Sequence, residues 1–299
     1  MSEKHSAKEI SDPFLIMDED NGAMYYGGDQ AWFKRNTMTF AGCGVVAAAN
    51  TMRALLCKYP DAYEKASGRL KTLGNVIITK SEYISVINDM YRKMFVAELP
   101  VANMIYDIKD VEYGSRLFNR IPPSFGMNAS SVVRGLLRYA DSHGVLIHDA
   151  YISASYIDYE KGLDFIKEGL DRNGAVILLT SFNRHPLTLY SGKAGETGKP
   201  VSVSGMKTHF ATITGITGDK EDPLIKLSTW GRVATISYRD LHKSWQKRRS
   251  FVSALIYFIP ERSRAMYRAD LRKASAFLPL CTLQSIIGRR LPKLSDRDR

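Results

Sequence analysis

The sequence predicts an α+β protein in which a mostly helical N-terminal part precedes a strand-rich C-terminal part. Apolar residues recur at helical spacing in four segments before Gly144. Beyond that glycine, short apolar or alternating runs bounded by turn residues predict strands, with one short helix among them. Helices first and strands later favour a separate antiparallel sheet over repeating βαβ units.

The helical part begins after about forty turn-rich residues, which predict an extended segment or loop. The run Cys43–Leu56 combines apolar residues at helical spacing with three consecutive alanines that permit close packing on several sides. We therefore expect it to be a buried central helix. Amphipathic patterns predict further helices over Asp61–Leu73, Ser81–Leu99 and Ser130–Ser142.

The C-terminal part contains six strand-like runs. They are Ala150–Ile157, Ala175–Ser181, His209–Ile216, Leu224–Thr229, Val233–Ser237 and Phe251–Ile259. A helix over Tyr159–Leu170, closing at Asn173-Gly174, separates the first two runs. The segment Pro186–Lys207 is rich in Gly, Ser, Thr and Lys without periodicity, so it predicts a long loop of the kind that is often functional.

Composition places the chain among ordinary globular proteins. Of its 299 residues, 44% are hydrophobic and 24% charged, which argues against disorder and fibrous structure. The N-terminus lacks the apolar run of a signal peptide, and the longest apolar stretches fall well short of the ~20 residues that span a bilayer. Three widely separated cysteines fit neither a disulfide framework nor a zinc site. We expect a soluble, cytoplasmic protein with reduced thiols and no cofactor.

The net charge of +11 is concentrated at the C-terminus. Residues 240–299 carry fourteen Lys and Arg against five Asp and Glu, whereas residues 1–239 carry 28 against 26. We therefore divide the chain into a domain over 1–260 and a basic, partly helical tail over 261–299. The tail could bind an acidic partner or an anionic membrane surface, or pack back on the domain with its charged face in solvent. Because the domain is nearly neutral, no nucleic-acid partner is expected.

Two residues suggest thiol chemistry. Cys43 lies between two glycines at the start of the predicted central helix, where free N–H groups and the helix dipole would stabilise a thiolate and lower its pKa. A packing role for this small side chain is the alternative.

His209 opens a predicted strand directly after the long loop, where the sheet would hold a base at the rim of a cleft. The alternative is a strand-end histidine bonded to a backbone carbonyl. His143 and His148 lack the carboxylate pattern of a metal site.

The order of these features resembles the papain-like cysteine peptidase superfamily. Gly42-Cys43-Gly44, followed by an alanine-rich helix with Asn50, is similar to the bacterial C39-like branch that processes bacteriocin leaders. The strand that begins at His209 also matches, and IKLSTWG over Ile225–Gly231 looks like the papain-type IKNSWG with one extra residue. The resemblance implies a papain-like fold, with a central helix that carries the cysteine, a helical middle region and a C-terminal antiparallel sheet.

The resemblance also implies roles for the reacting pair and its partner. Cys43 would attack an acyl carbonyl and His209 would act as its base. A third residue should orient the imidazole, and Ser228 or Thr229 takes the place of the family's asparagine, depending on where the extra residue falls. Asp222, in a predicted turn, is another candidate.

Two further site residues follow from the same resemblance. The family has an oxyanion-hole glutamine before the cysteine, and Gln30 would supply it if the chain folds back at Gly27-Gly28, although it precedes Cys43 by thirteen residues. Asn36 is the other amide candidate. Trp230 would shield the Cys43–His209 pair from water.

The resulting expectation is a cysteine hydrolase, most simply a peptidase that forms an acyl-enzyme on a peptide or protein substrate. An acyltransferase of transglutaminase type, in which an amine replaces water in the second step, would use the same residues. A catalytically silent binding module on the same scaffold is the third alternative.

Overall fold

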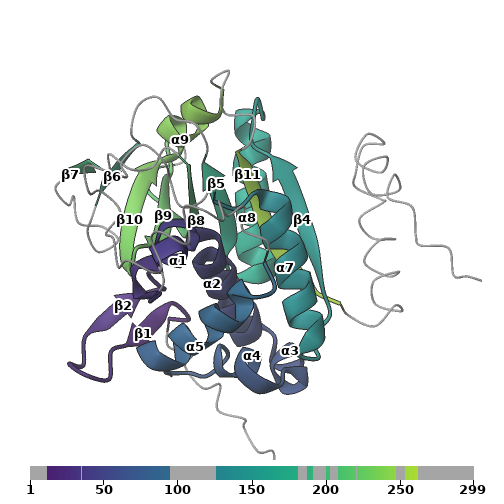
Figure 1. Ribbon diagram of the computed structural model, residues 1–299. Coiled ribbons are helices and arrows are strands. Elements are labelled where there is room, and N and C mark those ends of the chain that lie inside the picture. The colour runs from purple at the N-terminus through teal and green to yellow at the C-terminus, as the bar shows by residue number, and fades with distance from the viewer. Residues whose placement is uncertain are drawn as a thin grey trace, which may run out of the picture. The chain divides into compact units, whose positions relative to one another are not determined.

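The computed structural model describes residues 12–34, 36–94, 126–180, 187–190, 200–202, 208–219, 221–246 and 253–261 (Figure 1). The chain divides into two units, Met1–Pro260 and Glu261–Arg299. Only Glu261 of the second unit is described, so the predicted basic tail and its partners lie outside the described residues and stay predictions.

The first unit contains the strands and helices below, and each group is given in chain order. The strands are β1 (Leu15–Met17), β2 (Met24–Tyr26), β3 (Ile78–Thr79), β4 (Ile147–Ser153), β5 (Val176–Thr180), β6 (Thr188–Tyr190), β7 (Pro200–Ser202), β8 (His209–Thr217), β9 (Leu224–Thr229), β10 (Arg232–Ser237) and β11 (Ala254–Pro260). The helices are the 3₁₀ turn η1 (Gln30–Trp32), α1 (Asn36–Ala41), α2 (Cys43–Lys58), α3 (Pro60–Lys65), α4 (Gly68–Thr72), α5 (Lys80–Tyr91), α7 (Ala129–Ser142), α8 (Tyr159–Asn173) and α9 (Tyr238–Trp245).

The strands form two sheets (Figure 1). Eight strands form one sheet in the order β4-β11-β5-β8-β9-β10-β6-β7, and every neighbouring pair in it is antiparallel. Three strands form a small second sheet in the order β2-β1-β3, in which β1 and β3 are parallel. A large antiparallel sheet with helices packed on it, instead of repeating βαβ units, confirms the α+β prediction.

The large sheet has a hydrophobic core on each face. Successive strand residues point to opposite faces, so Ile177 and Leu179 of β5 join the core that contains α2, α5 and α7. Val176 and Leu178 join the core that contains α8 and α9. All five residues of β5 are buried, as predicted for a strand covered on both faces.

Helix α2 is the buried central helix that the sequence predicts, and most of its residues are buried. Its Arg53 is only 1% exposed, and its guanidinium donates hydrogen bonds to backbone carbonyls that include those of Pro13, Leu73 and Asn75. Burial lowers the pKa of Arg53 from its usual value. This side chain therefore ties the N-terminal segment and the loop before β3 to the central helix.

Some predicted elements differ in detail from the structure. The helix predicted over Asp61–Leu73 is two short helices, α3 and α4, because Ala66 leaves helical geometry and Gly68 has a φ of 53°. The segment Pro186–Lys207, predicted as a loop, contributes β6 and β7, which pair with each other and extend the large sheet from β10. The first forty residues include β1 and β2 of the small sheet, η1 and most of α1 as well as loops.

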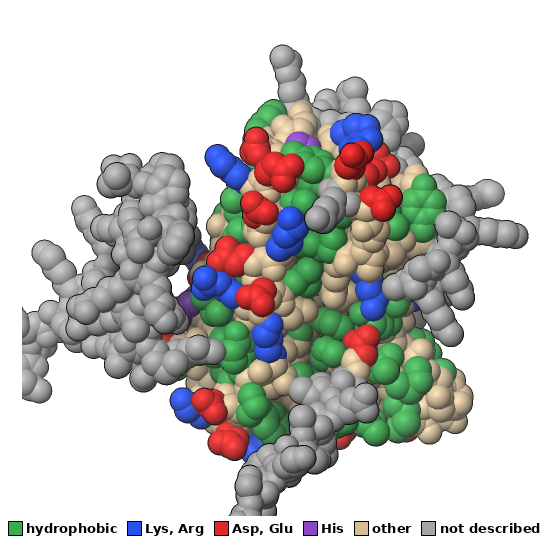
Figure 2. Space-filling model, turned by 180° about the vertical axis from the view of Figure 1, so that it is seen from behind, with side chains coloured by type: hydrophobic (Ala, Val, Ile, Leu, Met, Phe, Trp, Pro, Cys, Tyr) green, Lys and Arg blue, Asp and Glu red, His purple; other side chains and the backbone are tan. Residues whose placement is uncertain are grey.

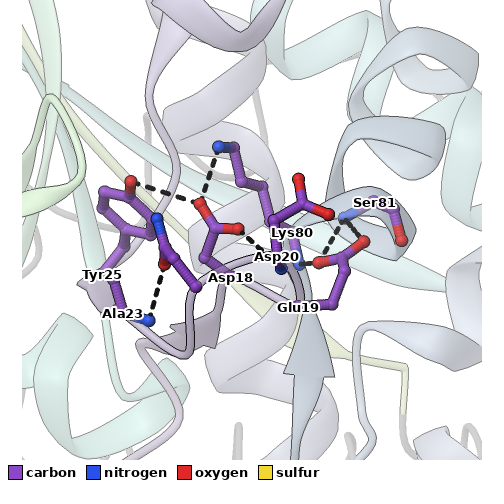
Figure 3. Close-up of polar contacts among 8 residues, drawn as sticks. Asp18, Glu19, Asp20, Ala23, Tyr25, Lys80 and Ser81 are labelled. Atoms are coloured by element: carbon purple, nitrogen blue, oxygen red, sulfur yellow. Dashed lines mark hydrogen bonds and ion pairs between the residues drawn. The ribbon is translucent and has the colours of Figure 1, made fainter.

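A polar cluster attaches the small sheet to the N-terminus of α5 (Figure 3). The Asp18 carboxylate lies 2.8 Å from the Lys80 ammonium, and that hydrogen bond is the main reason why the pKa of Asp18 is lowered. The Glu19 carboxylate accepts from the backbone N–H groups of Lys80 and Ser81, each at 3.1 Å. A carboxylate at this end of a helix is stabilised by unpaired N–H groups and by the helix dipole.

Charges of both signs are interspersed on the described surface. Figure 2 shows Lys and Arg side chains beside Asp and Glu side chains on the face that it displays. On α8, Arg172 pairs with Glu168 at 2.9 Å and Lys167 with Asp164 at 3.5 Å. None of the described helices is both long and apolar enough to cross a bilayer. The cytoplasmic location stays a prediction.

Candidate active site

Most of the predicted site residues surround one small cavity. Gln30 of η1, Cys43 of α2 and His209 of β8 line it together with Ser228 and Thr229 at the end of β9. Its volume is about 10 Å³, which is close to the minimum for one water molecule. The fold therefore brings together residues that are far apart in the sequence.

Cys43 is the first residue of α2. Gly42 precedes it and provides no side-chain cap, so the first N–H groups of the helix are left for other acceptors. The backbone N–H groups of Phe210, Gly44 and Cys43 favour the ionised form of the thiol and by themselves would lower its pKa. Burial nevertheless raises the pKa of Cys43, because desolvation of a thiolate outweighs these N–H groups. The predicted lowering of this pKa is therefore wrong.

His209 opens β8 and is 7% exposed. Burial lowers the pKa of its imidazole to about 4, because a charged ring would be desolvated there. The ring therefore stays neutral at pH 7. Among the described residues, no hydrogen bond joins the Cys43 thiol to this ring. At rest, the structure holds a neutral thiol and a neutral imidazole at one cavity.

Thr229 contacts the imidazole of His209. Its Oγ1 lies 2.8 Å from Nε2 of His209. Ser228 lies beside it but donates to the carbonyl of Tyr26 at 2.8 Å. Of the two hydroxyls that the resemblance leaves open, Thr229 therefore contacts the imidazole and Ser228 does not. Neighbouring strand residues point to opposite faces, which is why a shift of one residue exchanges their roles.

Asp222 does not reach the imidazole. Its carboxylate accepts from the Ser237 hydroxyl at 2.8 Å and from the backbone N–H of Arg239 at 3.1 Å. It precedes β9, whereas Thr229 ends that strand, and seven residues of extended chain span roughly 20 Å. Asp222 therefore belongs to the connection between β8 and β9, and its carboxylate binds the N-terminus of α9.

Trp230 covers the imidazole from a strained backbone position. It has a φ of 51° and Gly231 a φ of 68°, and together they form the two-residue turn between β9 and β10. Two positive φ values match the twist of a hairpin, but a bulky residue rarely adopts one. The indole stacks on His209 with the ring centroids 4.5 Å apart and the planes 20° apart. The turn thus places an apolar ring against the candidate base.

We expect Trp230→Ala to raise the pKa of His209 from about 4 toward its ordinary 6.5, because water would reach the ring face that the indole covers. An NMR titration of the histidine ring protons, assigned by comparison with His209→Gln, measures this pKa. If it stays near 4, other parts of the protein desolvate the ring and the stacking is not the cause.

Gln30 reaches the cavity despite its distance in sequence, because η1 and α1 take up most of the intervening chain. Its Nε2 donates to the carbonyl of Thr39 at 2.8 Å, and its buried Oε1 has no hydrogen-bond partner among the described residues. In this arrangement, the amide donors point to α1 and do not form an oxyanion hole. Asn36 begins α1, and its side chain lies outside the described part of the chain.

Sequence reasoning gave no role to two residues beneath this cavity. Asn50 of α2 and Tyr83 of α5 are both buried, and the Tyr83 hydroxyl donates to Asn50 Oδ1 at 2.7 Å. A polar amide within a run of apolar helix residues was the available signal, because such a group must find hydrogen-bond partners when it is buried.

No metal site accompanies the cavity within the described residues, where no group of three or more His, Cys, Asp or Glu is placed to hold an ion. His143 instead lies 3.6 Å from the Asp89 carboxylate and 2.8 Å from the carbonyl of Tyr139.

Neither a protein-family model nor a curated protein matches the chain. The chemistry of the site therefore rests on its own residues.

Proposed function

We propose that this protein is a cysteine hydrolase of papain-like fold, most simply a peptidase that forms an acyl-enzyme. One observation carries the proposal: a half-buried cysteine at the start of the central helix shares a cavity with a buried imidazole that is hydrogen-bonded to Thr229. The strand of the antiparallel sheet that begins at His209 and the Trp230-Gly231 turn support the papain-like assignment.

In the first step, the thiol proton moves to His209 as Cys43 Sγ attacks the carbonyl carbon of the substrate. The ring can accept this proton at Nδ1 if its Nε2–H donates to Thr229 Oγ1. The imidazolium then protonates the leaving amine as the carbon–nitrogen bond breaks. An acyl-enzyme with a carbon–sulfur bond results, and the imidazole is neutral again.

In the second step, His209 takes a proton from water, and the resulting hydroxide attacks the thioester carbon. The carbon–sulfur bond breaks, and the sulfur regains the proton from the imidazolium, which releases a carboxylic acid. An amine that attacks in place of water would give acyl transfer. The buried, water-poor surroundings of His209 favour such a neutral base at pH 7 over a preformed ion pair.

A catalytically silent binding protein is the second candidate, and two observations favour it. The cavity has room for about one water molecule, and the Gln30 amide donates to a backbone carbonyl instead of facing a developing oxyanion. An oxyanion donor contributes roughly 3 to 4 kcal/mol to transition-state stabilisation. Catalysis would therefore require the Gln30 side chain to turn, or the backbone N–H of Cys43 to act without it.

The pH dependence of Cys43 alkylation separates these candidates. Proton transfer within a thiol–imidazole pair does not change its net charge, so the fraction of thiolate–imidazolium is constant between the two pKa values of the pair. We expect the rate of carbamidomethylation of Cys43 to change less than about threefold between pH 5 and 8. Peptide mass spectrometry after timed reaction with iodoacetamide measures the rate.

Cys57 is a matched internal control. It is also partly exposed, and burial also raises its pKa, but no histidine lines its surroundings in the described contacts. Its rate should rise about tenfold per pH unit, as expected for a thiol that must ionise to react. In His209→Gln, the Cys43 rate should acquire the same slope. If the alkylation rates of Cys43 and Cys57 rise equally with pH in the wild-type protein, that result would contradict His209 as the base.

A further inference from the structure

The amide of Asn50 uses all of its hydrogen-bonding capacity beneath the candidate site. The side chain is 1% exposed. Its Oδ1 accepts from the backbone N–H of Gly28 at 3.2 Å and from the Tyr83 hydroxyl at 2.7 Å. Its Nδ2 donates to Thr212 Oγ1 at 3.3 Å and to Ser228 Oγ at 3.2 Å. Two acceptor positions and two donors are the full complement of an amide.

Three of the four contacts of this amide lead to segments that carry a site residue. Asn50 belongs to α2, which begins with Cys43. Thr212 lies three residues beyond His209 on β8, and Ser228 directly precedes Thr229 on β9. Gly28 lies two residues before Gln30. One buried side chain thus joins the four segments that form the cavity.

The close approach of these segments requires glycine at Gly27 and Gly28. A Cβ at Gly27 would lie 2.0 Å from Ser228 Oγ and 2.7 Å from Asn50 Nδ2, and its φ of +74° disfavours other residues. A Cβ at Gly28 would lie 2.3 Å from the Tyr83 ring. The backbone is therefore packed directly against the hydrogen-bonded amide, which leaves little freedom for α2 to shift along the sheet.

We infer that Asn50 is a positioning residue, which sets the register of the Cys43 helix against the strands that carry His209 and Thr229. This inference rests on the proposed thiol–imidazole chemistry. The two donors of Nδ2 link the helix to the sheet, whereas the two contacts of Oδ1 link it to Gly28 and α5. If the donors are lost, Ser228 and Thr212 present lone pairs to the helix, and proton transfer between thiol and ring loses its geometry.

Asn50→Asp tests the inference with nearly the same shape. A carboxylate keeps the acceptor positions toward Gly28 and Tyr83 but has no donor for Thr212 or Ser228, and a carboxylic acid has only one. We expect the flat pH profile of Cys43 alkylation to be lost, so that its rate rises about tenfold per pH unit like that of Cys57. A merely structural role would lower the melting temperature and leave the profile flat.

Tyr83→Phe is the matched control. It removes a buried hydrogen bond to the same amide and leaves both links to the sheet, so the Cys43 profile should stay flat although the melting temperature falls. A flat Cys43 alkylation profile in Asn50→Asp would overturn the inference. So would a Cys43 profile in Tyr83→Phe that rises with pH as steeply as that of Asn50→Asp. If Asn50→Asp does not fold, Thr212→Val removes one sheet acceptor and should steepen the Cys43 slope; an unchanged slope would count against the inference.

The same data keep the two proposals apart. A wild-type profile that rises with pH and does not respond to His209→Gln contradicts the proposed function. A flat wild-type profile that depends on His209 but survives Asn50→Asp contradicts only the positioning role of Asn50.

Discussion

Replacing Cys43 with alanine is expected to abolish peptide cleavage, with a loss on the order of 10⁴-fold or more, as when a nucleophile is removed. The proposed reaction forms its covalent intermediate at Cys43 Sγ, and no other thiol lines the cavity among the described residues. The side chain is small and partly exposed, so the melting temperature should stay within a few degrees of the wild-type value.

Digestion of a peptide library, followed by mass spectrometry, measures this loss and shows the preferred substrate. Cys57→Ala is the matched control and should cleave at the wild-type rate, because Cys57 lies near the C-terminal end of α2, about four turns from Cys43. Cleavage that persists in Cys43→Ala would contradict the proposed nucleophile. Cleavage by neither protein, together with reaction of acyl-thioester donors by the wild type alone, would favour acyl transfer.

Periodicity predicted the elements that hold the site. The helix that carries Cys43 and the strands that begin at His209 and end at Thr229 have patterns set by local backbone geometry, and the structure contains them. Strands β6 and β7 were not predicted because they are short pieces of a Gly- and Ser-rich segment. Their pairing with β10 is a tertiary contact, which no local pattern encodes.

The electrostatics of the site could not be predicted in the same way. A cysteine between glycines at a helix start indicates a stabilised thiolate, but the local signal contains nothing about desolvation by the sheet, which reverses the direction of the pKa shift. The sequence left Ser228 and Thr229 open, because the extra residue of IKLSTWG relative to the papain-type IKNSWG can be placed before or after either of them. Only the pairing of β9 with its neighbours decides which of the two hydroxyls faces His209.

His209 is expected to make the protein sensitive to acid. The unfolded chain binds a proton at this ring below its ordinary pKa of 6.5, whereas the folded protein does so only near about 4. A group whose pKa is lowered by folding contributes stability that is fully present above pH 6.5 and is lost as the pH falls toward 4. At 1.36 kcal/mol per pH unit, the free energy of unfolding should fall by about 3 kcal/mol through this group.

Urea unfolding at pH 7 and pH 4 measures this loss when wild type is compared with His209→Gln, because carboxylates that titrate in the same range contribute equally to both proteins. We expect the wild type to lose about 3 kcal/mol more than the variant. An equal loss would mean that folding leaves the pKa of His209 near its ordinary 6.5 and that burial does not lower it. The acid sensitivity of stability therefore tests whether the fold keeps a proton off the proposed base below pH 6.5.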